Sequence, residues 1–74
     1  MSEKRVKFVV IAEKRVTRAI KDLRLIGNLS NKNNYSYTEN DVQKMISALE
    51  QEVKNLKNKF AMGDAKSLQI FKLE

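Results

Sequence analysis

The residues with the clearest chemical potential are cations near the N-terminus. Six Lys or Arg side chains recur at helical spacing and fall on one side of the predicted first helix, away from its apolar stripe. A row of cations on one face can bind anionic groups such as phosphates or carboxylates, with an affinity that falls as salt rises. The predicted partner-binding or nucleic-acid-binding residues are Lys4, Lys7, Lys14, Arg18, Lys21 and Arg24.

Catalytic chemistry has little support in the sequence. The chain contains no His and no Cys, the side chains that most often titrate or attack near neutral pH. Glu50 and Glu52 are neighbours in sequence, so on a helix they point to different sides and do not form an acid and base pair. Gly27 and Gly63 lie in no phosphate-binding glycine pattern. We therefore predict no catalytic residues, no metal site, no cofactor and no small-molecule substrate.

The positive charge is concentrated in the first third of the chain. The net charge is +6 over 74 residues. Residues 1–27 hold eight Lys or Arg against three acidic residues, and the segment from Glu39 onward is balanced. This asymmetry predicts an anionic partner for the first segment, such as nucleic acid, an acidic protein surface or a membrane face. A solvated helix face is also normally charged, so the pattern alone does not choose between a binding role and solubility.

Two amphipathic helices must position these cations. Apolar residues recur at alternating steps of three and four, which is a helical period. The first stripe predicts a helix over about residues 5–27 that ends at Gly27 in the left-handed conformation. The second predicts a helix over about 39–62 that ends at Gly63. The first stripe contains Val9, Ala12, Val16, Ala19, Leu23 and Ile26, and the second contains Val42, Ile46, Leu49, Val53, Leu56 and Phe60.

An Asn-rich loop over residues 28–38 connects the two predicted helices, because short polar side chains compete for backbone hydrogen bonds. Thr38 and Asp41 have the spacing of a capping box at the start of the second helix. Tyr35 and Tyr37 could stack on exposed bases, although tyrosines beside a bend more often pack across it. Residues 63–74 are expected to form a tail, with the whole of 1–74 as a single domain.

The expected fold class is therefore all-α, an antiparallel two-helix hairpin that dimerises into a four-helix bundle. The runner-up is a β-α-α-β arrangement, because Phe8 to Ile11 is apolar on all sides and residues 67–73 could supply a partner strand. The predicted core and oligomer residues are Val16, Leu23, Ile46, Leu49, Val53 and Leu56.

The expected function is that of a small cytoplasmic, non-enzymatic interaction module. It would form a homodimer and bind an acidic protein through the basic face of its first helix. The alternative is a sequence-independent nucleic-acid-binding protein that uses the same face. The apolar run from Phe8 to Ala12 is too short to span a membrane or to serve as a signal peptide.

Overall fold

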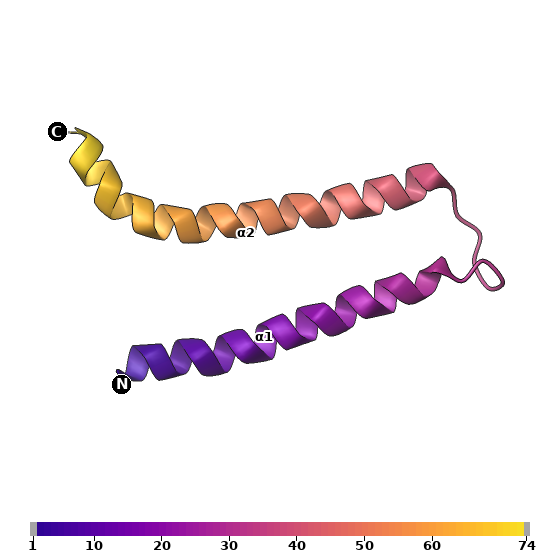
Figure 1. The fold of residues 1–74 in the computed structure, drawn as a ribbon, viewed down its shortest axis with the longest axis horizontal. Coiled ribbons are helices and arrows are strands. Elements are labelled where there is room, and N and C mark those ends of the chain that lie inside the picture. Colours follow the sequence, from indigo (N-terminus) through magenta and orange to yellow (C-terminus); the bar gives the residue numbers. More distant parts are fainter. Residues whose placement is uncertain (1, 74) are drawn as a thin grey trace. The chain divides into compact units, whose positions relative to one another are not determined.

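The computed structural model contains two long α-helices and a short connection. It describes the backbone of residues 2–73 and the side chains of residues 2–62. Helix α1 spans Glu3–Gly27, the 3-10 turn η1 spans Asn28–Ser30, and helix α2 spans Glu39–Leu73 (Figure 1). No strand occurs in the part of the chain whose backbone is described. The all-α class is confirmed at this level.

The chain divides into two units, residues 1–36 with α1 and residues 37–74 with α2. None of the residues from 2 to 62 is buried. The predicted core residues are thus exposed or partly exposed in the single chain. A stable core in a chain of this size requires that these side chains be covered, because apolar burial is the main force that stabilises a fold.

Helix α1 begins at Glu3, two residues before the predicted start. The hydroxyl of Ser2 accepts a hydrogen bond from the backbone N–H of Arg5 over 3.1 Å, and the Ser2 backbone is extended. Ser2 is therefore the N-cap of α1, and Glu3 places a negative charge in the first turn, where the helix dipole is positive. This cap extends the helix over the whole apolar run from Phe8 to Ile11.

The end of α1 falls at the predicted residue but has a different geometry. Gly27 keeps a right-handed helical backbone, with φ of −59° and ψ of −31°. The prediction of a left-handed Gly27 was wrong. The N–H of Asn28 instead donates toward the carbonyl oxygens of Arg24, Leu25 and Ile26. The helix tightens into η1, which satisfies its last carbonyl groups without a left-handed residue.

The loop is ordered by its own asparagines. The side-chain oxygen of Asn31 accepts a hydrogen bond from the N–H of Asn33 over 3.0 Å. The carbonyl oxygen of Asn31 accepts from Asn34 and Tyr35, over 3.1 and 3.0 Å. Such local bonds are the reason that asparagine favours turns. Of the predicted loop over residues 28–38, residues 28–30 form the 3-10 turn η1, and residues 31–38 form neither helix nor strand.

The predicted capping box begins α2 as expected. The hydroxyl of Thr38 accepts from the N–H of Asp41 over 3.1 Å, and a carboxylate oxygen of Asp41 accepts from the N–H of Thr38 over 2.9 Å. Two backbone donors at the start of the helix are therefore satisfied reciprocally. The acidic side chains of Glu39 and Asp41 also lie in the first turn, at the positive end of the helix dipole.

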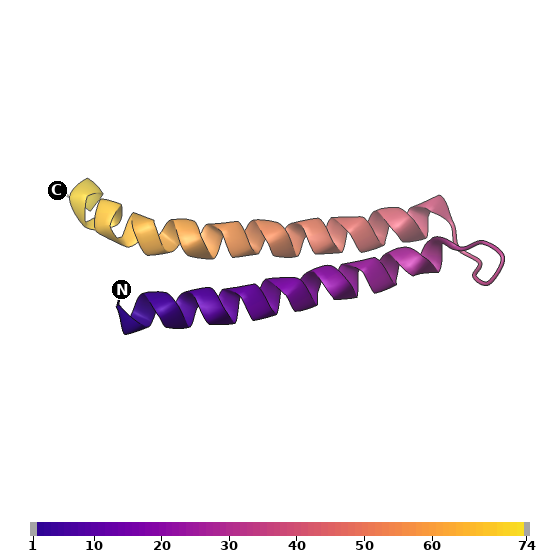
Figure 2. The ribbon, with the colours of Figure 1, turned by 60° about the horizontal axis from the view of Figure 1, so that its bottom comes forward.

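The predicted end of the second helix and the runner-up fold were both wrong. Helix α2 does not stop at Gly63 but continues to Leu73 (Figure 2). Residues 8–11 and 67–73 both lie in helices, so neither forms a terminal strand. A single glycine within a helix costs about 1 kcal/mol relative to alanine, which the surrounding helix formers can offset. No proline follows Gly63 to prevent continuation.

Candidate interaction surfaces

The six predicted cations all lie on α1, and all six are exposed. Each residue of an α-helix turns the chain by about 100° and advances it by about 1.5 Å. Lys7, Lys14 and Lys21 are spaced by seven residues and therefore form a line with members about 10.5 Å apart. Arg18 lies next to this line on the helix surface. We name Lys7, Lys14, Arg18 and Lys21 the ridge core, which occupies a sector of about 60°.

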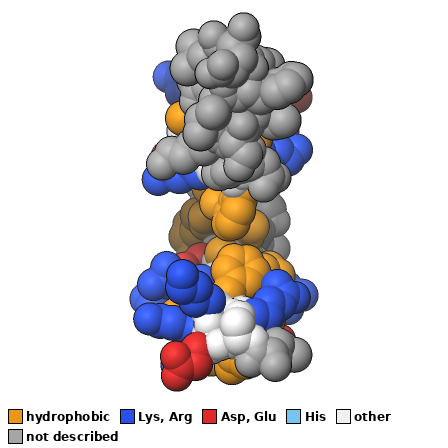
Figure 3. Space-filling model, turned by 90° about the vertical axis from the view of Figure 1, so that its left-hand side faces the viewer, with side chains coloured by type: hydrophobic (Ala, Val, Ile, Leu, Met, Phe, Trp, Pro, Cys, Tyr) orange, Lys and Arg blue, Asp and Glu red, His pale blue; other side chains and the backbone are white. Residues whose placement is uncertain are grey.

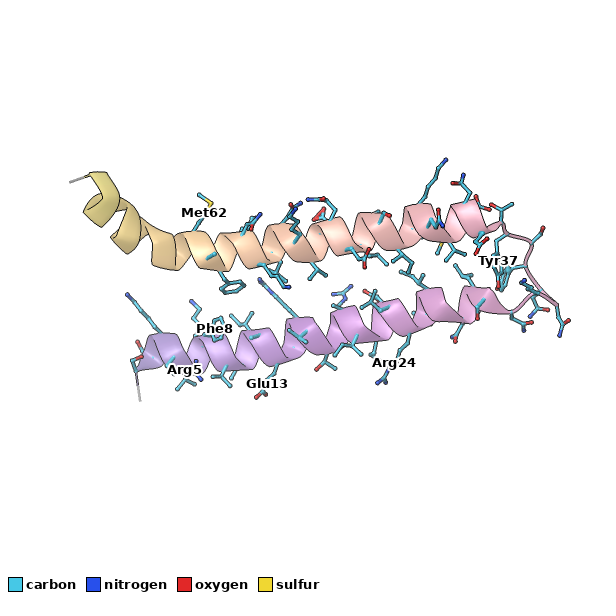
Figure 4. All side chains as sticks on the ribbon, turned by 45° about the horizontal axis from the view of Figure 1, so that its top comes forward. Arg5, Phe8, Glu13, Arg24, Tyr37 and Met62 are labelled. Atoms are coloured by element: carbon cyan, nitrogen blue, oxygen red, sulfur yellow. The ribbon has the colours of Figure 1, made fainter. Side chains whose placement is uncertain are left out.

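Lys4 and Arg24 lie at the edges of this surface. Figure 4 shows Glu13 and Arg24 extending from the same side of α1, and Phe8 extending from the opposite side. Arg24 follows Glu13 by eleven positions, which corresponds to a net rotation of only about 20°. Arg24 thus shares its side of the helix with an acidic residue. Between Lys7 and Lys21, by contrast, no acidic position falls within the sector of the ridge core.

We call the side of α1 that faces away from its own apolar stripe the outward side. Besides the ridge core, it carries apolar residues. Val10 is 55% exposed and Leu25 is 64% exposed, while Ile11 is partly exposed. The seven-residue spacing places Ile11 and Leu25 on one line with Arg18, next to the lysine line. The signal that separates them from the stripe is their position about 110° or more from its centre.

The apolar stripe of α1 is on the other side of the helix from the ridge core. Val9, Ala12 and Ile26 are partly exposed, and Val16 and Leu23 are exposed. Arg5 lies within this side, with its guanidinium carbon 5.9 Å from the centre of the Phe8 ring. Around the start of α1, Lys and Arg side chains lie on both sides of the hydrophobic surface (Figure 3). The stripe is therefore bordered by charge at its N-terminal end.

The apolar stripe of α2 is narrower. Its six members alternate at steps of four and three and fall within a sector of about 80°. Leu49 is partly exposed, and Ile46, Val53 and Leu56 are about half exposed. Glu50 and Lys57 border the stripe on one side, and Glu52 and Lys59 border it on the other. On the far side, the Gln51 amide donates to the Asn55 side-chain oxygen over 2.9 Å.

The two tyrosines of the loop have different environments. Tyr35 is 49% exposed, whereas Tyr37 is partly buried. Their predicted alternatives, base stacking and packing at the bend, both remain predictions. Among residues whose side chains are described, no group of three or more acidic, His or Cys residues could hold a metal ion.

No helix, within the residues that were searched, is both long and apolar enough to cross a bilayer.

In a comparison with known proteins, no family model, no curated protein and no solved structure matches the chain.

Proposed function

We propose that the chain is a small cytosolic, non-enzymatic interaction module that self-associates and binds an acidic protein partner through α1. The observation that carries the proposal is the separation of the two faces of α1. The ridge core points away from the apolar stripe by roughly 160°. A flat surface cannot contact both faces of one helix together. The stripe can therefore be covered by another helix while the ridge core engages an anionic partner.

The register of the sequence supports an antiparallel pairing of the two helices. If Gly27 lies opposite Thr38, each stripe residue of α1 from position 9 to 23 meets one of α2. Small residues then face branched ones, which favours close packing. The opposed pairs are Leu23 and Val42, Ala19 and Ile46, Val16 and Leu49, Ala12 and Val53, and Val9 and Leu56.

Self-association is proposed because one such hairpin buries a single stripe on each helix. Phe8 and Ile20 flank the stripe of α1 and are 50% and 43% exposed. Chains of this size commonly need oligomerisation, a disulfide or a metal to reach a stable core, and this chain has no cysteine. Packing two hairpins into a four-helix bundle would cover these flanks. Sedimentation equilibrium at micromolar concentration should give twice the monomer mass, and a folded monomer would contradict this part of the proposal.

The alternative function is sequence-independent nucleic-acid binding. It is favoured by the regular line of lysines, which can follow a phosphate backbone without reading bases. The same residues would carry both functions. A binding panel with acidic peptides, single-stranded DNA and duplex DNA, each at several salt concentrations, distinguishes them.

Reversal of Lys14, Arg18 and Lys21 to Glu should abolish binding to whichever anionic probe the chain binds, because three attractive charges become repulsive. Reversal of Lys44, Lys54 and Lys59 to Glu is the matched control, since it makes the same change of net charge on α2. Duplex binding whose logarithm falls with the logarithm of salt by a slope of roughly four would favour the alternative. Equal loss in both triple variants would show that only net charge matters and would contradict the assignment to α1.

A further inference from the structure

The outward side of α1 is not a purely basic surface. Val10 and Ile11 lie between Lys7 and Lys14 along the helix, and Leu25 follows Lys21. Leu25 is 64% exposed, the largest exposed fraction among the large hydrophobic side chains that the structure places. Isolated exposed apolar residues are ordinary, but Ile11 and Leu25 lie two heptads apart, beside a line of cations. A partner that matches a surface of this kind must carry both opposite charges and apolar groups. A uniform row of charge would require the opposite charges alone.

The positions of Ile11 and Leu25 define the spacing that the apolar groups of a partner must match. They are fourteen residues apart, which is two heptads and about 21 Å along one line of the helix. Arg18 lies midway between them on the same line, and Lys14 and Lys21 lie on the neighbouring line. Because this side faces away from the stripe, a partner helix seated on the stripe would leave Ile11 and Leu25 uncovered. Their exposure therefore needs an explanation separate from self-association.

The two classes of anionic partner differ in what they offer this surface. A phosphate backbone supplies charge at close spacing, but it presents little apolar surface to Ile11 and Leu25. An acidic amphipathic helix supplies carboxylates for the lysine line together with apolar side chains at heptad spacing. Opposite charges improve orientation and association, and apolar contacts supply most of the binding free energy. The mixed surface thus favours a protein helix.

We infer that the outward side of α1 is a docking surface for an acidic amphipathic helix of at least four turns. Apolar side chains of this partner cover Ile11 and Leu25, and its carboxylates pair with the ridge core of Lys7, Lys14, Arg18 and Lys21. The inference rests on the proposed function, because it names the partner of the same surface. It adds that the partner is recognised by apolar contacts as well as by charge.

The test uses the full chain and two synthetic helical peptides of about 20 residues with equal negative charge. One peptide carries leucines at heptad spacing, and in the other each leucine is replaced by glutamine. Fluorescence anisotropy measures both dissociation constants at about 50 and 150 mM salt, where electrostatic screening differs. The unmodified chain should bind the leucine peptide about tenfold more tightly, because Leu25, which is 64% exposed, and Ile11, which is partly exposed, become covered.

The double variant Ile11→Gln with Leu25→Gln should bind both peptides equally, at the affinity that the unmodified chain has for the glutamine peptide. Glutamine keeps the helix propensity, and circular dichroism checks that helicity is unchanged. The matched control is Met62→Gln, which removes an exposed apolar side chain from α2 and should preserve the tenfold preference.

Three outcomes would overturn the inference. A preference for the leucine peptide that survives the double variant would place the contact elsewhere, and the absence of any preference would leave a purely electrostatic surface. Tighter binding of a duplex of about 20 base pairs that is indifferent to Ile11 and Leu25 would favour nucleic acid instead. Failure to bind either peptide at about 50 mM salt would contradict the proposed function itself.

Discussion

Helices α1 and α2 have similar apolar periodicity but very different charge. Within Glu3–Gly27 the chain has eight Lys or Arg and three acidic residues, whereas Glu39–Leu73 has six Lys and five acidic residues. The charges that border the α2 stripe include both signs on each side. The cations of α1 gather on the side away from its stripe. The same helical period therefore supports two different surfaces.

This difference indicates a division of roles. A stripe limited to alternating steps of three and four with mixed charge at its borders is typical of a helix that packs lengthwise against other helices. α2 has such a stripe, with Ile46 and Val53 at one heptad position and Leu49 and Leu56 at the other. α1 has a stripe and an independent charged face. We infer that α2 contributes mainly to assembly and that α1 contributes to both assembly and partner binding.

The largest expected effect comes from placing a charge in the α2 stripe. Leu49→Asp should destabilise the proposed assembly by about 3 kcal/mol or more, because it removes a leucine that this assembly would cover and would bury an unpaired carboxylate. Sedimentation equilibrium and a thermal melt followed by circular dichroism measure the loss. The control is Asn58→Asp, which adds the same charge on the far side of α2 and should change stability by no more than about 0.5 kcal/mol. Equal effects of the two variants would show that the stripe is not covered.

The two helix starts provide a second comparison. Thr38→Ala removes the hydroxyl that caps α2 and should lower stability by about 1 kcal/mol. Ser2→Ala removes the single side-chain bond at the start of α1 and should have a smaller effect, because the helix terminus can fray there with little loss of packing. Urea titrations of both variants measure the difference. A larger loss for Ser2→Ala would indicate that the start of α1 contributes more to the assembly than the capping box of α2.

Gly27→Ala should stabilise the chain by about 0.4 to 1 kcal/mol. Gly27 has a right-handed helical backbone, and an added Cβ would meet no atom within 4 Å. Alanine also restricts the unfolded chain, which favours the folded state. A thermal melt gives the sign of the change directly. A loss of stability would show that Gly27 adopts the left-handed conformation that the sequence had suggested.

The smallest expected effect concerns the N-terminal end of the α1 stripe. Arg5→Gln removes the cation that lies 5.9 Å from the centre of the Phe8 ring. An exposed cation–π pair contributes about 0.5 kcal/mol, so the helicity of residues near Phe8 should fall only slightly. Arg15→Gln removes an equal charge elsewhere on α1 and is the control. Residue-specific amide hydrogen exchange compares the two, and equal protection at Phe8 would contradict a contribution from the pair.

Much of the fold was predictable because strong local signals agree with each other. Periodicity identified both helices, and Thr38 and Asp41 identified the start of α2. The ends were less predictable. Gly63 resembled a stop, but a glycine ends a helix only when the chain also changes direction, and the residues after it continue the helix. Gly27 ended α1 through a 3-10 turn that its type alone does not specify.

The candidate surface was predictable in composition but not in detail. The sequence identified six cations on one helix, and seven-residue spacing then separated a ridge core from Lys4 and Arg24 at its edges. The two apolar residues on this surface, Ile11 and Leu25, are visible in the sequence. Their meaning depends on knowing that residues 3–27 form one continuous helix, because a strand at residues 8–11 would have placed Val10 and Ile11 on opposite faces.

Thiol labelling tests the central claim, that each helix has one covered face and one free face. The chain has no cysteine, so single substitutions are specific probes. Leu23→Cys and Leu49→Cys report on the stripes, and Lys21→Cys and Gln51→Cys report on the opposite faces. If one face of each helix is covered, the two stripe thiols react at least about tenfold more slowly than the two outer thiols, and the difference disappears in denaturant. Equal rates in all four variants under native conditions would contradict the claim.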